Sequence, residues 1–160
     1  MNKLQMRLEG DTVIVGTRTF DAEPELVYRA HTDPAIVQRW CTGPDGWRMT
    51  VCENDARPGG KIRYEWQNDD GHGFSLTGEF VELVPFSRLV HIERMHLPDT
   101  TPDNRVETVF EPFEGGTRMT MRMNLPDQAT RDAMIQTGME AGMEISYQRL
   151  EREIAAGGLA

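Results

Sequence analysis

The sequence predicts a single α+β domain in which an antiparallel sheet of about seven strands is covered by one long C-terminal helix. Three observations favour this fold. The chain has 160 residues, the usual size of one domain with a substantial core. Residues 47–124 alternate between apolar and polar positions, as strands do. Residues 126–155 repeat apolar side chains every three or four positions, which is helical spacing. No repeat or linker divides the chain, so we expect one domain over residues 1–160.

The first predicted elements are a strand and two short helices. Residues 12–20 are rich in β-branched side chains, which favour a strand. Pro24 suits the first turn of a helix, where its missing N–H would have no partner in any case. Asp33-Pro34 combines an N-cap acceptor with a proline at the first helical position. It therefore starts a second helix, which includes Trp40 and ends before the turn at residues 43–46.

The middle of the chain is predicted to form six strands. In residues 61–67, Ile62, Tyr64 and Trp66 share one face and polar or charged residues share the other, as in a sheet that is exposed to water on one side. Turns such as Pro58-Gly59-Gly60 separate the strands, and residues 97–104 are expected to form an exposed loop. The six expected strands are residues 47–52, 61–67, 74–84, 89–96, 105–113 and 117–124.

The last helix is expected to cover the sheet. Its apolar side runs from Ile135 to Ile154, and its other side carries Arg131, Glu144 and further charged residues. One face of the sheet is apolar, and this helix is the only predicted element long enough to bury it. A bent sheet closes poorly around a single helix, so the space between them is a natural place for a small molecule.

Composition narrows the classes of partner. The chain has 26 acidic and 17 basic residues, and its formal charge of −9 repels nucleic acid and anionic lipid. No apolar run is long enough to cross a bilayer. The two cysteines, Cys41 and Cys52, form no CxxC motif and indicate a reducing, cytoplasmic location. Neither metal-binding spacing nor a phosphate-binding glycine loop occurs, so we expect no metal and no cofactor.

Short motifs occur in order along the chain, beginning with residues 20–28, 32–40 and 55–60. Their order resembles that of the START-like (helix-grip, SRPBCC) superfamily, and most closely that of its branch of heat-shock-protein-90 ATPase activator-like and polyketide cyclase-related proteins. The resemblance implies a helix-grip fold and members that bind varied hydrophobic molecules or assist chaperones. Many relatives have a Gly-Trp pair where this chain has Gly142-Met143, so a rigid wall is replaced by a flexible thioether. The matching segments are residues 20–28, 32–40, 55–60, 78–80, 85–90, 115–117 and 138–150.

The candidate ligand-binding residues are those expected to face the space between helix and sheet. They are aromatic or methionine-rich, which suits a loosely specific apolar pocket. The alternative is that the same side chains form an ordinary core, which is the usual role of apolar stripes. The candidates are Trp40, Tyr64, Trp66, His91, Glu93, Phe110, Met119, Met121, Met139, Met143 and Tyr147.

The orientation of His91 and Glu93 is left open by the sequence. They alternate on one strand and therefore share a face. If that face is inward, Glu93 is a potential general acid or base; if it is outward, the pair is solvated. His31 and His72 are expected at the surface, and Asp55 and Arg57 are expected to pin a turn as an ion pair. No residue is assigned as catalytic.

Three functions follow from these patterns. The first is the binding of a small apolar or aromatic molecule between the last helix and the sheet. The second is a cyclase- or hydrolase-type enzyme that acts on a polyketide-like substrate. The third is an interaction protein that docks a chaperone through its acidic surface, although the chain lacks the extra region expected of a full chaperone activator. Exposed strand edges also favour a homodimer, for which the sequence specifies no interface.

Overall fold

The computed structural model describes residues 2–157 and 159, and within them nine strands form one antiparallel sheet with four helices. The α+β helix-grip prediction is confirmed. The strands are β1 (Gln5–Glu9), β2 (Val13–Phe20), β3 (Trp47–Asn54), β4 (Lys61–Asn68), β5 (Gly73–Val84), β6 (Arg88–Leu97), β7 (Asp99–Thr100), β8 (Asn104–Phe113) and β9 (Gly116–Asn124). The helices are α1 (Pro24–Thr32), α2 (Pro34–Trp40), α3 (Gln128–Gln136) and α4 (Met139–Ala155).

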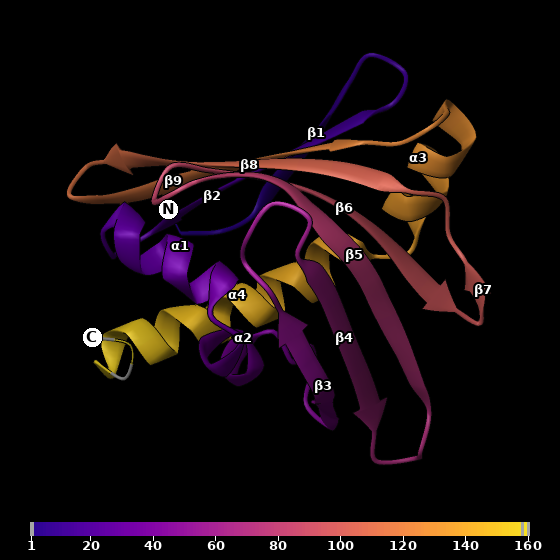
Figure 1. Ribbon diagram of the computed structural model, residues 1–160, viewed down its shortest axis with the longest axis horizontal. Helices are drawn as coiled ribbons and strands as arrows, with labels where there is room; N and C mark the ends of the chain where they lie inside the picture. The colour runs from indigo at the N-terminus through magenta and orange to yellow at the C-terminus, as the bar shows by residue number, and fades with distance from the viewer. Residues whose placement is uncertain (1, 158, 160) are drawn as a thin grey trace.

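The sheet is strongly curved, and its concave side holds α1, α2 and α4 (Figure 1). Its strand order is β1-β2-β9-β8-β6-β5-β4-β3, with β7 paired to β6 outside this path. Helix α1 packs on β8 and β9, and α2 packs on β3 and α4. These two short helices therefore close one end of the space between α4 and the sheet.

The helix starts follow the predicted signals, but the C-terminal helix is not continuous. Pro24 occupies the first turn of α1, and the Asp33 side chain accepts a hydrogen bond from Ala35 N at 3.0 Å to cap α2. The prediction of one helix over residues 126–155 was wrong, because Gly138 adopts a left-handed φ of 78° and separates α3 from α4. Apolar residues keep their helical spacing across this break, so the spacing alone predicts one continuous helix. The glycine after Thr137 was the available signal of a break, because glycine commonly ends helices.

Two short strands were also missed. β1 is almost fully exposed, so it lacks the apolar alternation that predicts a strand, and it forms only by pairing with β2. β7 lies within residues 97–104, which were predicted to be a loop. It pairs with the end of β6, where Leu97 lies opposite Asp99. The six strands predicted over residues 47–124 are all present, and β3 extends two residues further, to Asn54.

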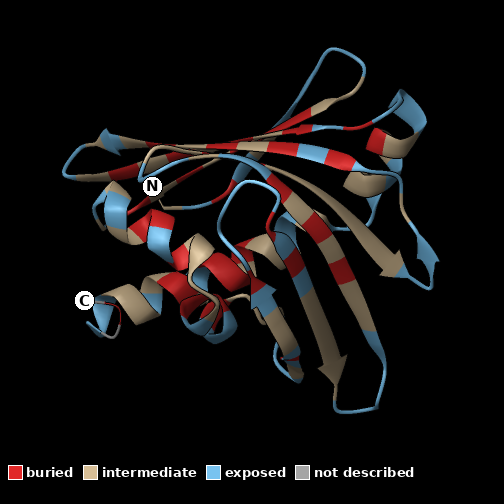
Figure 2. Ribbon diagram, in the orientation of Figure 1, coloured by how far each residue is buried: buried red, intermediate tan, exposed pale blue. Residues whose placement is uncertain are grey.

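The core lies between α4 and the concave face (Figure 2), and it includes a buried ion pair that the sequence did not indicate. Arg18 on β2 is only 2% exposed, and its guanidinium donates to Glu144 at 2.9 Å and to Glu151 at 2.8 Å. Glu144 and Arg131 had been assigned to the solvent side of the helix, but both are buried. Glu144 is buried because it is the partner of Arg18 and also accepts from Leu4 N.

The turn before β4 has the predicted ion pair. Arg57 Nε lies 2.7 Å from a carboxylate oxygen of Asp55. A side chain at Gly60 would place its Cβ only 1.8 Å from the Asp55 carbonyl oxygen, so the turn requires glycine there. Within the described residues, no helix is both long and apolar enough to span a membrane.

Candidate functional site

The inner face of β4, β5 and β6 carries the polar groups of the candidate site. Register pairs Phe80 with His91 and Gly78 with Glu93, so these residues share the face of the buried Phe80. His91 and Glu93 therefore point inward, and their side chains are 18% and 21% exposed. His91 Nε2 lies 2.7 Å from Glu93 Oε1, and the His91 ring contacts the ring of Phe80. Gly78 lies opposite Glu93, and a Cβ there would come within 2.2 Å of the Ile92 carbonyl oxygen, so the backbones of β5 and β6 approach closely at this point.

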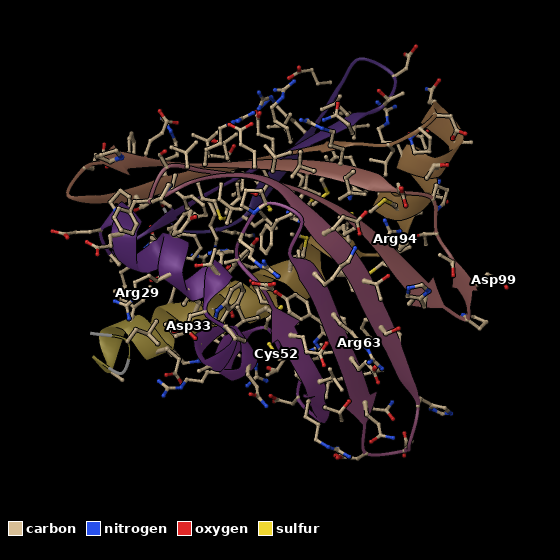
Figure 3. All side chains as sticks on the ribbon, in the orientation of Figure 1. Arg29, Asp33, Cys52, Arg63, Arg94 and Asp99 are labelled. Atoms are coloured by element: carbon tan, nitrogen blue, oxygen red, sulfur yellow. The ribbon has the colours of Figure 1, made fainter. Side chains whose placement is uncertain are left out.

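The opposite face of the same strands is charged. Arg63 and Arg94 lie on it (Figure 3), and Arg94 donates to Glu79 at 2.9 Å and to Asp103 at 2.7 Å. The alternation along β6 thus separates an outward ion-pair network from the inward His91–Glu93 pair.

Five of the predicted ligand-binding residues lie in the closed end of the interior. Trp40 and Tyr147 stack with ring centroids 5.6 Å apart, and the indole of Trp40 donates to Ala30 O at 2.9 Å. These side chains fill the space under the C-terminal half of α4 and act as core. The five buried residues are Trp40, Phe110, Met119, Met121 and Tyr147.

The other predicted residues lie toward the open end, where they are only half-buried. Met139 and Met143 continue the inner stripe of α4 beyond Tyr147 toward the start of the helix. Tyr64 and Trp66 are on β4, with ring centroids 5.9 Å apart. The inward-facing Met95 on β6 is a further half-buried residue that the sequence analysis did not single out. We call Tyr64, Trp66, His91, Glu93, Met95, Met139 and Met143 the inner cluster.

His31 was predicted to lie at the surface, and this was wrong. Its ring packs between Trp40, with centroids 5.0 Å apart, and Phe110, at 5.4 Å. Burial, with a smaller contribution from nearby His91, lowers the pKa of His31 to about 4. The sequence did hold a signal, because His31 follows the buried Val27 by four residues and so shares its face of α1.

Hydrogen bonds connect α1 and α2 to the inner cluster. Asn54 Nδ2 donates to the Tyr64 hydroxyl at 2.8 Å and to His31 O at 3.1 Å. The indole N–H of Trp66 donates to Cys41 O at 2.7 Å. Burial raises the pKa of Tyr64, and it raises that of Cys41 to about 12, so both groups are neutral at neutral pH. Cys41 is therefore a poor nucleophile.

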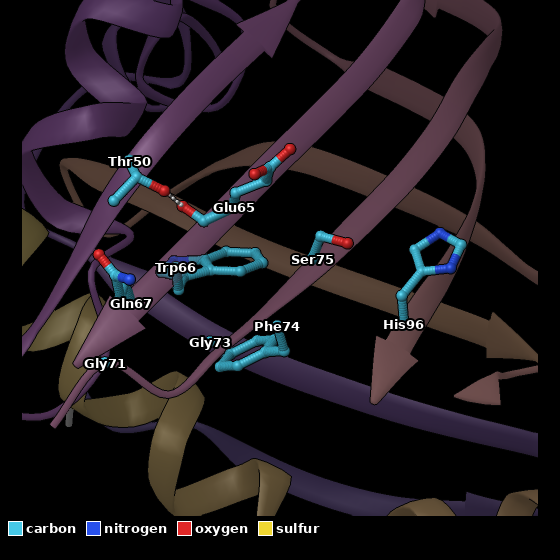
Figure 4. A pocket seen from close by; sticks show the side chains of 9 residues that line it. All are labelled: Thr50, Glu65, Trp66, Gln67, Gly71, Gly73, Phe74, Ser75 and His96. Atoms are coloured by element: carbon cyan, nitrogen blue, oxygen red, sulfur yellow. Dashed lines mark hydrogen bonds between the residues drawn. The ribbon is translucent and has the colours of Figure 1, made fainter. Parts of the chain in front are cut away.

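Two hollows lie elsewhere on the protein, and Trp66 is the one member of the inner cluster that lines either of them. One, of about 430 Å³, crosses β3–β6 and is lined mainly by polar residues of the outer face, including Thr50, Glu65, Ser75 and His96 (Figure 4). The other, of about 90 Å³, lies near Thr19. Neither is the predicted cavity between the C-terminal helix and the sheet, which stays a prediction. Among the residues that the structure describes, no group of three or more His, Cys, Asp or Glu side chains is arranged to hold a metal ion.

Comparison with known proteins places most of the chain in one family. Residues 21–155 match the model of the family described as "Activator of Hsp90 ATPase homolog 1-like protein". A crystal structure of a Rhodobacter sphaeroides protein is similar, with 31% identity and a TM-score of 0.91 over 97% of this chain and 99% of that one. No curated protein matches the sequence.

Two more distant structures share the fold. A Nitrosomonas europaea protein has 21% identity and a TM-score of 0.82, over 96% of this chain and 100% of its own. An AHSA1-like protein from Aeromonas hydrophila has 24% identity and a TM-score of 0.71, over 92% of this chain and 95% of its own.

Proposed function

The chain belongs to the Activator of Hsp90 ATPase homolog 1-like family, and we propose that it binds a small apolar or aromatic molecule on the concave face of its sheet. The ligand lies against the inner cluster, at the end that α1 and α2 leave open. One observation carries the proposal: an inward His91–Glu93 pair lies on the same face as half-exposed aromatic and methionine side chains. Binding sites combine apolar walls with a few oriented polar groups in this way.

The apolar members of the inner cluster supply the binding energy. Trp66, Met139 and Met143 are packed against the core on one side but remain partly exposed on the other. Covering apolar surface contributes about 25 cal/mol for each Å² removed from water. Methionine side chains also adapt their shape to different partners, which favours a range of related ligands over a single one.

The experiment is a thermal-shift screen of uncharged bicyclic aromatic compounds. We expect active compounds to raise the melting temperature of the wild-type protein, because they bind only the folded state. Trp66→Ala and Met143→Glu should abolish the shift. Phe86→Ala and Val84→Glu are matched controls, since both side chains are exposed and lie outside the inner cluster. Absence of a shift across a chemically diverse set would contradict the proposal.

The inward orientation of His91 and Glu93 also supports a second candidate, an enzyme of cyclase or hydrolase type that acts on a polyketide-like substrate. The hydrogen-bonded pair could accept a proton from a substrate held on the inner cluster. Turnover that is lost in His91→Gln, while ligand-induced thermal shifts persist, would separate this function from simple binding.

The family description supports a third candidate, interaction with a chaperone. The formal charge of −9 would steer a basic partner surface toward the protein. Direct binding to a purified chaperone of the Hsp90 class, weakened by added salt, would support it. No binding at low salt would exclude it.

A further inference from the structure

Two buried acceptors near the base of the inner cluster have no hydrogen-bond partner among the described residues. His31 Nδ1 lies 2.7 Å from Val27 O, and because a carbonyl oxygen can only accept, Nδ1 carries the ring proton. His31 Nε2 is therefore a bare acceptor, and it is buried without a hydrogen-bond partner. Asn54 Oδ1 is a second buried acceptor without a partner. Both atoms are buried, so they add partial negative charge beneath the inner cluster rather than a contact that a ligand can reach.

Glu93 adds acceptor capacity where a ligand can reach it. One of its oxygens, Oε1, is bound by His91 Nε2 at 2.7 Å. The other oxygen receives no hydrogen bond from any residue in the part of the chain that the structure describes. Glu93 keeps 21% of its side chain exposed. A ligand resting on the inner cluster can therefore donate to Glu93 directly.

The charges around the inner cluster disfavour an anionic ligand. Burial is the main cause of the raised pKa of Tyr64 and of Tyr147, and the negative charge of Glu93 raises both further. The buried cation Arg18 is already paired, because its guanidinium binds Glu144, Glu151 and the Thr19 carbonyl. Among the described residues, Arg18 is therefore occupied by its carboxylate partners, and His91 is already bound to Glu93.

We propose that the ligand is an aromatic molecule that carries an O–H or N–H donor and no carboxylate, and that its donor binds Glu93. This inference rests on the proposed function and narrows its ligand class. It predicts that phenol- or amine-bearing aromatics bind, and that fatty acids and aromatic acids are rejected because their carboxylate would meet the carboxylate of Glu93.

The test compares three naphthalenes of similar size by isothermal titration calorimetry at neutral pH. 2-Naphthol keeps the donor, 2-methoxynaphthalene lacks it, and 2-naphthoate replaces it with a carboxylate. We expect 2-naphthol to bind about tenfold or more tightly than 2-methoxynaphthalene, the usual effect of a hydrogen bond to a charged group. We expect 2-naphthoate to bind more weakly than either.

The variant Glu93→Gln tests the assigned acceptor. It should reduce the preference for 2-naphthol over 2-methoxynaphthalene to about threefold or less and should improve binding of 2-naphthoate. The matched control is Glu53→Gln on the exposed face of β3, which should keep the wild-type order of affinities. The melting temperature of each variant without ligand confirms that it is folded.

The outcomes separate this inference from the proposed function. Equal binding of all three compounds, or tightest binding of 2-naphthoate, overturns the donor inference and leaves apolar binding intact. Failure of all three compounds to bind overturns both. A wild-type preference for 2-naphthol that Glu93→Gln leaves unchanged overturns the assignment to Glu93.

Discussion

The buried imidazole of His31 should make the stability of the protein depend on pH. Its pKa falls from 6.5 to about 4 on folding, mainly because of burial. The folded state thus keeps His31 neutral at pH values where the unfolded chain protonates it. This lowered pKa contributes stability above pH 6.5, and the contribution is lost as the pH falls to about 4. At about 1.4 kcal/mol for each pH unit, the loss over this window is about 3 kcal/mol.

Carboxylates also weaken the fold in acid, but they do so at lower pH. Hydrogen bonds from Thr130 lower the pKa of Asp127 below its ordinary value of 3.8. Burial alone would raise the pKa of Glu144, but hydrogen bonds from Arg18 and Leu4 hold it below 4.5. A carboxyl group whose pKa is lowered on folding stabilises the protein above its unfolded-state pKa. This stabilisation is lost as the pH falls below that pKa. Between pH 4.5 and 6.5, the change in stability with pH should therefore come from His31 and not from these two carboxylates.

Urea unfolding at several pH values between neutrality and pH 4 measures this effect. We expect the wild-type free energy of unfolding to fall by about 3 kcal/mol, and that of His31→Phe to fall much less from its own value at neutral pH. Any constant packing cost of the substitution cancels, because only the change with pH is compared. His72→Phe, in an exposed turn, should behave like wild type. If His31→Phe keeps the full wild-type fall, the assignment to His31 is refuted.

The remaining predictions concern the buried ion pair and the helix break. Arg18→Met should lower the free energy of unfolding by about 3–5 kcal/mol, because it strands the buried carboxylate of Glu144, whereas Arg7→Met, on an exposed arginine, should change it by less than about 0.5 kcal/mol. Equal effects in urea unfolding would contradict the structural role of Arg18. Gly138→Ala should cost about 1 kcal/mol, because φ is 78° there. Gly142→Ala, in the interior of α4 with no atom within 4 Å of its Cβ, should instead stabilise the protein by up to about 1 kcal/mol. The same sign for both glycine variants in thermal unfolding would exclude a helix break at Gly138.

Most of the fold could be predicted because its elements carry local signals. The alternation of Ile62, Tyr64 and Trp66 identifies both β4 and its buried face, and Pro24 and Asp33 mark the helix starts. β1 could not be predicted in this way, because its residues are exposed on both faces and only the pairing with β2 makes them a strand. Local pattern therefore fails where an element depends on a partner distant in sequence.

The site was predicted less completely than the fold, because its geometry depends on packing between elements. Alternation shows that His91 and Glu93 share a face but cannot say which face points inward; that depends on β6 pairing with β5 beside Phe80. Residue type likewise could not show that Tyr147 is buried in the closed end while Met143 stays partly exposed in the open end. That division is set by where α1 and α2 pack.

The interior contains two buried polar systems, which differ in how far their hydrogen-bonding groups are paired. Around Arg18 the hydrogen-bonding groups are matched, since Glu144 and Glu151 bind its guanidinium and hold α4 against β2. Around His31 they are not matched, since Nε2 and the nearby Asn54 Oδ1 are both buried without partners. A network that served stability alone would gain by closing, because an unpaired buried polar group costs about 1–3 kcal/mol. The matched system joins α4 to β2, and the unmatched one lies between the aromatic side chains of the closed end and Tyr64 of the inner cluster, next to the proposed ligand site.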